Sequence, residues 1–122
     1  MNTIDLQIQS TASDGKHTPR KIVGMARDLG LAAIALTDHD TVAGIGEALG
    51  AGSEYGVRVI PGIEISVEEY GLHLLGYDID YKDEALRAAL AKAAEDRIAG
   101  ARRMVENLQH AGFMLSWDDV VR

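Results

Sequence analysis

Three short apolar segments alternate with two segments of helical spacing, and this order constrains the fold more than any other feature of the sequence. Residues 3–9 alternate between apolar and polar side chains, which predicts a strand with one polar face. Residues 31–36 and 57–60 are apolar without alternation, which is typical of short strands buried on both faces. We expect the last of these strands to end at Pro61-Gly62.

Two helices are predicted between these strands. Thr18 and Pro19 are typical first residues of a helix, and the apolar residues that follow keep helical spacing up to Gly30. A second helix is predicted over about 42–53, despite the glycines within it. The order strand–helix–strand–helix–strand predicts an α/β fold with a parallel sheet or barrel.

The pattern changes after Gly62. Residues 63–68 alternate and 72–79 are apolar again, which predicts a strand pair with a turn at Tyr70-Gly71. Residues 83–110 predict a helix, with Gly100 as a point where it divides. A further helix is expected to start with a capping box from Ser116 to Asp119. The sequence thus predicts an α/β portion, 1–82, followed by a helical segment, 83–122.

Composition excludes several classes of function. The 122 residues include no cysteine, so disulfides and thiolate metal sites are excluded. No apolar run has the length of a membrane span, and the N-terminus lacks a signal-peptide pattern, so we expect a cytoplasmic protein. The net charge of −7 disfavours duplex nucleic acid as a ligand, although acidic groups gathered in a cleft can hold divalent cations.

Polar residues follow the predicted strands where functional sites of parallel α/β folds gather. Asp14 follows the first strand and His39 the second, while Glu64 follows the third and His73 lies near the start of the next. Two imidazoles and two carboxylates form a ligand set suited to Mn, Zn or Fe. A glutamate such as Glu64 can also bridge two metals, as in two-metal phosphoryl hydrolysis.

Each of these residues also has a simpler explanation when it is taken alone. Asp14 is a common type of turn residue, and His73 could be a core histidine with one hydrogen bond. Glu64 could merely face water. The second helix could be capped by one of the aspartates before it, Asp38 or Asp40.

Four motifs, in order and at familiar spacing, resemble the PHP family (polymerase and histidinol phosphatase domain). They are Asp5-Leu-Gln-Ile-Gln-Ser with Ser13-Asp14-Gly15, Thr37-Asp38-His39-Asp40-Thr41, Ile60-Pro61-Gly62-Ile63-Glu64-Ile65-Ser66, and His73-Leu74-Leu75-Gly76-Tyr77. The motifs cover residues 1 to about 80. The helical stretch that follows is similar to the insert of small PHP phosphoesterases that act on nucleotides and short oligonucleotides.

The resemblance implies the N-terminal portion of a distorted seven-stranded, TIM-like β/α barrel with a helical insert. It further implies two or three bound metals and the hydrolysis of phosphoesters by water that the metals activate. Carried over residue by residue, Asp14, His39, Glu64 and His73 would be metal ligands, and Glu64 would be the bridging one.

The sequence departs from the family in two ways. The family has His-x-His where this chain has Gln7 and Gln9, and an amide oxygen is a weak ligand for Zn or Mn compared with imidazole. The later family motifs, with further ligands, lie beyond residue 122. Half a barrel leaves strand edges and apolar flanks open, so we expect a homodimer that pairs two half-sheets or exchanges the 83–110 helix.

Three hypotheses for the function follow. The first is a metal-dependent phosphoesterase, impaired in this chain, that acts on a nucleotide, another phosphorylated small molecule or a short oligonucleotide. The alternative is a catalytically inactive, dimeric PHP-derived binding or assembly module. A third is a deliberately shortened or altered piece of a larger enzyme, in which Gln7 and Gln9 were introduced to silence it.

Overall fold

A computed structural model describes residues 3–67 and 71–121 of the chain. It divides into two compact units, Met1–Arg87 and Ala88–Arg122. The division expected from the sequence, between residues 82 and 83, stays a prediction, as does the cytoplasmic location. Within the described residues, no helix combines the length and apolar character that a bilayer span requires.

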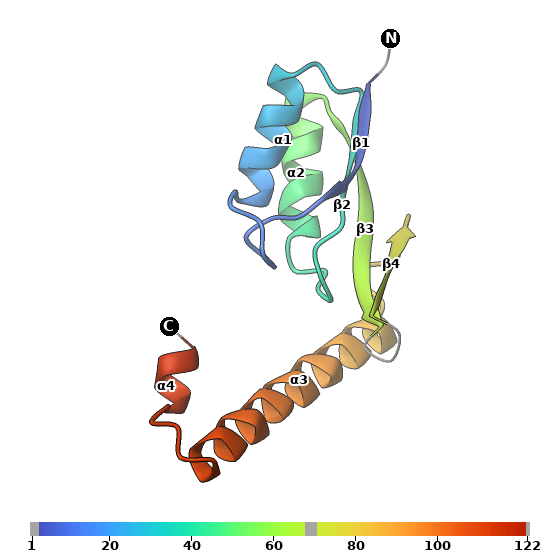
Figure 1. The fold of residues 1–122 in the computed structure, drawn as a ribbon. Coiled ribbons are helices and arrows are strands. Elements are labelled where there is room, and N and C mark those ends of the chain that lie inside the picture. The colour runs from blue at the N-terminus through green and yellow to red at the C-terminus, as the bar shows by residue number, and fades with distance from the viewer. Residues whose placement is uncertain (1–2, 68–70, 122) are drawn as a thin grey trace. The chain divides into compact units, whose positions relative to one another are not determined.

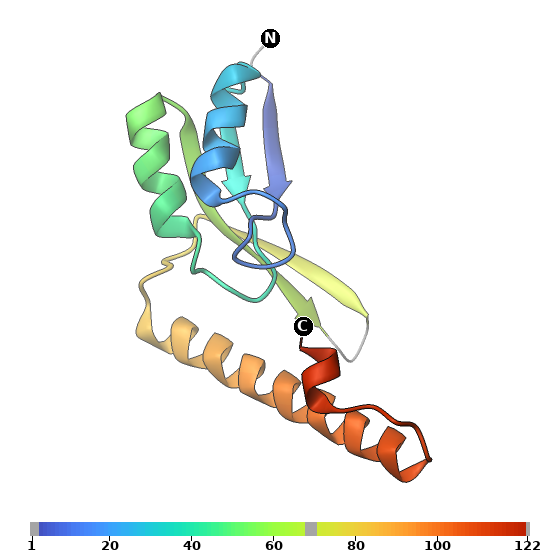
Figure 2. The same ribbon diagram turned by 90° about the vertical axis from the view of Figure 1, so that its left-hand side faces the viewer.

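The first unit is built on a mixed sheet of four strands in the order β1-β2-β3-β4. The first three strands run parallel, and β4 pairs antiparallel with β3. Two helices, α1 and α2, lie side by side on one face of this sheet (Figures 1 and 2). The elements are β1 (Ile4–Ile8), α1 (Pro19–Asp28), β2 (Ala33–Leu36), α2 (Ile45–Tyr55), β3 (Arg58–Val67) and β4 (Leu72–Tyr77). The predicted α/β class is confirmed, whereas the seven-stranded barrel stays a prediction, since the described residues supply four strands.

The third strand is longer than the sequence indicated. Strand β3 does not end at Pro61-Gly62 but continues to Val67. Its first part pairs with β2, as far as the pair Leu36–Pro61, and its second part pairs with β4 from Gly62 onward. A Cβ at Gly62 would lie 2.9 Å from the Thr37 methyl and 3.0 Å from the Gly76 carbonyl oxygen. The glycine therefore permits close strand packing where β3 changes neighbours, and does not form a turn.

Apolar residues of both helices pack against β2 to form the core of the first unit. Helix α1 begins as predicted, with Thr18 accepting a hydrogen bond from the Lys21 N–H and Pro19 in the first turn. Helix α2 starts later than expected, at Ile45, and its N-cap is Gly44, without a side-chain cap. The buried core residues are Ile22, Val23, Ala26, Ile34, Leu36, Ala48, Ala51 and Val57.

The second unit contains most of helix α3 (Glu84–His110) and the short helix α4 (Trp117–Val120). Helix α3 runs through Gly100 without interruption, so the division expected there is wrong. One interior glycine costs only about 1 kcal/mol, and the alanine-rich sequence around Gly100 favours helix. Helix α4 has the predicted capping box, in which Ser116 and Asp119 bond each other's backbone N–H. The Arg102 guanidinium lies 4.2 Å from the centre of the Trp117 ring.

The strand pair predicted after Gly62 is confirmed by the antiparallel pairing of β3 with β4. The expected end of the first of these strands at Glu68 lies outside the described residues. So does Tyr70 of the predicted turn, whereas its neighbour Gly71 has a positive φ of 59°.

Two glycines of α2 provide a matched test of the close packing between α2 and the start of β3. A Cβ at Gly52 would lie 2.7 Å from the Val57 carbonyl oxygen, while a Cβ at Gly50 would meet no atom within 4 Å. We expect Gly52→Ala to lower the free energy of unfolding by about 1–3 kcal/mol through overpacking. Gly50→Ala should raise it by about 0.5–1 kcal/mol, because alanine favours helix. Urea unfolding of both variants measures the difference, and equal effects would contradict the close helix–strand contact.

Candidate metal centre

The candidate site is centred on the carboxylate of Glu64, which is only 5% exposed. Glu64 lies on β3, and the backbone around His39 runs beside it as a continuation of β2. The Glu64 N–H donates to the Asp38 carbonyl, the Asp40 N–H donates to the Glu64 carbonyl, and His39 forms a parallel bridge with Glu64. These main-chain bonds fix His39 next to Glu64.

Side chains from β1, from the residue that follows it and from β4 donate hydrogen bonds to the same carboxylate. The Gln9 amide nitrogen lies 2.6 Å from Oε2, and the Gln7 amide nitrogen lies 3.2 Å from Oε2 and 3.4 Å from Oε1. The Nδ1 of His73 lies 3.1 Å from Oε1. His73 pairs with Ser66, two residues beyond Glu64, so the two side chains are diagonal neighbours on one face of the strand pair.

These contacts determine the charge of Glu64. Burial by itself raises the pKa of this carboxyl group. Hydrogen bonds from Gln7 and His73 lower the pKa, and the neighbouring imidazole of His39 and the bond from Gln9 lower it further. The pKa of Glu64 lies below its ordinary value as a result, so at neutral pH the group is an ionised carboxylate that can only accept hydrogen bonds.

The His39 ring faces both carboxylates of the site. Its Nε2 lies 3.7 Å from Glu64 Oε2 and 3.9 Å from Asp14 Oδ2, beyond hydrogen-bond distance in both cases. The ring stands perpendicular to that of His73, with centroids 4.9 Å apart. Its Nδ1 is buried and has no hydrogen-bond partner among the residues that the structure describes.

The arrangement of these groups fits a divalent cation. Each of His39, Glu64 and His73 offers a ligand atom, and these atoms all lie within 4.8 Å of one another. Ligand atoms around one transition metal, each about 2.1 Å from the ion, are roughly 3–4 Å apart, so the observed separations are only slightly too long for one shared ion. The structure thus brings together three of the four expected ligands, and Asp14 lies at the edge of the group with its side chain 68% exposed.

The loop after β1 holds Asp14 in place. The Gly15 N–H and the Ser13 N–H both donate to the Ser10 carbonyl oxygen. A Cβ at Gly15 would lie 2.2 Å from the Gln9 carbonyl oxygen, so only glycine permits the loop to fold back this closely. The turn interpretation of Asp14 and its position near His39 are therefore compatible.

The Asp38 carboxylate anchors this loop by hydrogen bonds and does not cap α2. Its carboxylate is 2% exposed and accepts three hydrogen bonds: from the Ser10 N–H at 2.6 Å, the Ser10 hydroxyl at 2.8 Å and the Ser13 hydroxyl at 2.7 Å. Asp40 does not cap α2 either, since its carboxylate accepts the Ser66 N–H at 2.9 Å. Both aspartates connect loops around the site, a role that the spacing of the sequence did not reveal.

Tyr77 is a further contact that the sequence analysis missed. Its hydroxyl donates to the Leu6 carbonyl oxygen at 2.9 Å, so a side chain of β4 bonds the backbone of β1. The only sequence signal was its place at the end of the last motif, because its partner is distant in sequence.

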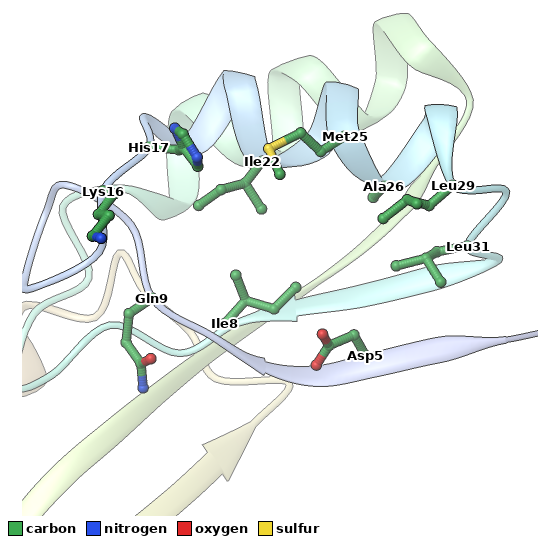
Figure 3. Close-up of a pocket in the computed structure, with 10 residues that line it drawn as sticks. All are labelled: Asp5, Ile8, Gln9, Lys16, His17, Ile22, Met25, Ala26, Leu29 and Leu31. Atoms are coloured by element: carbon green, nitrogen blue, oxygen red, sulfur yellow. The ribbon is translucent and has the colours of Figure 1, made fainter.

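A separate apolar groove of about 230 Å³ lies between β1 and α1 (Figure 3). Ile22 and Met25 of α1 face Ile8 across it, and Gln9 lies at its rim. Gln9 therefore stands between this groove and the carboxylate of Glu64. The groove is lined by Asp5, Ile8, Gln9, Lys16, His17, Ile22, Met25, Ala26, Leu29 and Leu31.

The three bonds to Asp38 lead to a prediction. In Asp38→Asn the NH2 group can replace Oδ2 only if the Ser10 hydroxyl turns from donor to acceptor, and the bonds from the Ser10 N–H and the Ser13 hydroxyl lose their charged acceptor. We expect the free energy of unfolding to fall by about 1–3 kcal/mol. The control, Asp28→Asn, alters an exposed aspartate paired with Arg27 and should change it by less than about 0.5 kcal/mol. Chemical denaturation compares the two, and equal stability would contradict the supporting role of Asp38.

Comparison with known proteins identifies a matching family and similar sequences. Residues 5–111 match the model of the PHP domain. The chain is 36% identical to a 3',5'-nucleoside bisphosphate phosphatase of Chromobacterium violaceum, over 100% of this chain and 44% of that protein. It is 38% identical to a 5'-3' exoribonuclease of Salmonella typhimurium, over 97% of this chain and 42% of that protein. The chain thus spans less than half the length of these curated relatives.

A solved structure gives the same result for the fold. A protein of Bifidobacterium adolescentis to which metal-dependent phosphoesterase activity is ascribed superposes with a TM-score of 0.80 at 36% identity. The match covers 98% of this chain and 42% of that one. Family model, sequence relatives and fold agree, and the chain belongs to the PHP domain family.

Proposed function

We propose that this chain carries part of the active site of a metal-dependent phosphoesterase, with Asp14, His39, Glu64 and His73 as metal ligands. The observation that supports it is the convergence of His39, Glu64 and His73 within 4.8 Å around one buried carboxylate. The relatives named above are a phosphatase and an exoribonuclease, both of which cleave phosphoester bonds. The proposed substrate is a nucleotide, another phosphorylated small molecule or a short oligonucleotide.

The chemistry of the donor set supports this proposal. Imidazole nitrogens with carboxylate oxygens suit Mn, Zn or Fe better than Mg or Ca. A divalent ion held there would supply Lewis-acid activation of water and of the phosphate group. In this proposal His39 and Glu64 hold the ion, and the exposed Asp14 and His73 complete the site on its open side, where a substrate can approach.

We further propose that activity in this chain is impaired. Gln7 and Gln9 turn amide nitrogens toward Glu64, and neither offers the imidazole that a metal prefers. The alternative, an inactive binding or assembly module, is supported by the same observation, because the hydrogen bonds satisfy Glu64 without a metal.

Phosphatase assays with and without metal distinguish an impaired enzyme from an inactive module. We expect slow hydrolysis of a nucleoside 3',5'-bisphosphate by the wild-type chain with added Mn²⁺, and none after chelation. His39→Ala should lower the rate at least about 100-fold, because Lewis-acid activation contributes several kcal/mol. The control is His110→Ala, which alters an exposed histidine bonded to the Glu106 carbonyl at 2.8 Å. Absence of turnover by wild type at saturating Mn²⁺ would contradict an active site and favour the inactive module.

We also propose a homodimer in which two copies meet along β1. Within the described residues, β1 pairs with β2 alone, and the apolar groove of Figure 3 lies beside it. Leu29, at the rim of this groove, is 73% exposed. An unpaired parallel edge next to an apolar groove favours association.

Light scattering tests this assembly. We expect wild type to have twice the mass of one chain, and Leu29→Glu to have the mass of a monomer, because the charge would be buried at the contact. Met114→Glu, at an exposed apolar residue of the second unit, should leave the mass unchanged. A monomeric wild type would exclude the dimer.

A further inference from the structure

The carboxylate of Glu64 has no acceptor site to spare. Each carboxylate oxygen can accept about two hydrogen bonds. Oε2 accepts from Gln9 at 2.6 Å and from Gln7 at 3.2 Å, and Oε1 accepts from His73 at 3.1 Å and more weakly from Gln7 at 3.4 Å. Four contacts therefore occupy four positions, and three of them come from the two glutamines.

The orientation of both amides follows from the chemistry of the carboxylate. A carboxylate that only accepts hydrogen bonds must face the NH2 group of an amide and not its oxygen. Gln7 and Gln9 lie two residues apart and project from the same side of the chain, so both NH2 groups reach Glu64. Their amide oxygens, the only atoms with which glutamine can bind a metal, are directed away from the carboxylate.

A cation that binds Glu64 must take one of these occupied positions. It has to break at least one hydrogen bond from an amide, and the remaining NH2 hydrogens carry positive charge that repels it. We propose that Gln7 and Gln9 form an amide clamp on Glu64 that competes with divalent cations, so that these glutamines weaken metal binding and are not ligands. This inference rests on the metal centre proposed above.

We expect Gln9 to oppose metal binding by Glu64 more strongly than Gln7 does. Gln9 makes the shorter bond and is partly buried, whereas the Gln7 amide is divided between both oxygens at longer distances and is exposed. Hydrogen bonds weaken as they lengthen, so removal of the Gln9 amide should release the carboxylate more than removal of Gln7.

Two roles of the amides, clamping Glu64 or binding the metal through oxygen, predict opposite changes in metal affinity when the amides are removed. If the amides rotated to offer oxygen to the metal, their removal would take away ligands and weaken binding. If they clamp Glu64, removal frees an acceptor position and strengthens binding. The sign of the change in metal affinity therefore decides between them.

The experiment is calorimetric titration of Zn²⁺ and Mn²⁺ into the chelator-treated 122-residue chain. We expect Gln9→Leu to bind the metal about tenfold more tightly than wild type, in line with the strength of a hydrogen bond to a charged group. Gln7→Leu should show a smaller increase. Gln109→Leu is the matched control, because its amide donates to the Leu115 carbonyl in the second unit and its loss should leave the affinity unchanged. His39→Ala should abolish binding and so locates the ion.

Thermal unfolding without metal gives a second readout. Gln9→Leu leaves the buried carboxylate short of a donor, so the unfolding midpoint of this variant should lie below that of wild type. Added Zn²⁺ should raise the midpoint of the variant by more than it raises the midpoint of wild type. If Gln9→Leu does not fold, the exposed Gln7→Leu tests the same sign.

Each outcome bears on the clamp. Tighter binding by Gln9→Leu supports it. Equal or weaker binding by Gln9→Leu, with measurable binding by wild type, overturns the clamp and leaves the proposed metal-dependent activity standing. No binding by wild type or by either leucine variant overturns both, because release of Glu64 would then have created no metal site.

Discussion

A buried carboxylate imposes the main constraint on this structure. Removing an ionised group from water is costly unless donors or cations surround it, and Glu64 sits inside the sheet with almost no access to solvent. The chain meets this requirement with side chains from strands far apart in sequence. Gln7 and Gln9 come from the β1 segment and His73 from β4, while His39 stands alongside on the continuation of β2. The relative placement of these segments and the charge of Glu64 are therefore coupled.

The backbone of β3 makes this convergence possible. Its first part completes the parallel sheet and its second part pairs with β4, so Glu64 lies just past the point where the strand changes neighbours. Gly62 allows the strands to approach closely there. Buried Asp38 holds the loop after β1 through Ser10 and Ser13, and so connects the first strand to the same point. Polar groups at strand ends thus serve the architecture as well as the site.

The same two positions of a PHP domain can have opposite electrostatic consequences. A neutral histidine offers a nitrogen lone pair to a metal, and the metal then neutralises the glutamate. A glutamine offers NH2 hydrogens, which neutralise part of the charge of Glu64 directly. Either arrangement can satisfy a buried carboxylate, and in this chain the amides of Gln7 and Gln9 do so.

The sequence by itself determined the α/β class, the strand and helix order, the capping of α1 and α4, and the family. Local patterns suffice for the secondary structure, because periodicity and caps act over a few residues, whereas the family came from the resemblance of four motifs. It also predicted that Asp14, His39, Glu64 and His73 would gather, through the rule that parallel strand ends meet at one edge, and the structure brings the last three together with Asp14 at the edge of the group. It did not reveal that β3 passes through Pro61-Gly62, that Asp38 supports a loop, or that amide nitrogens face Glu64. The course of β3 depends on its pairing with both β2 and β4. The roles of Asp38 and of the two amides depend on partners 25 to 57 residues away, whose positions only the tertiary structure decides.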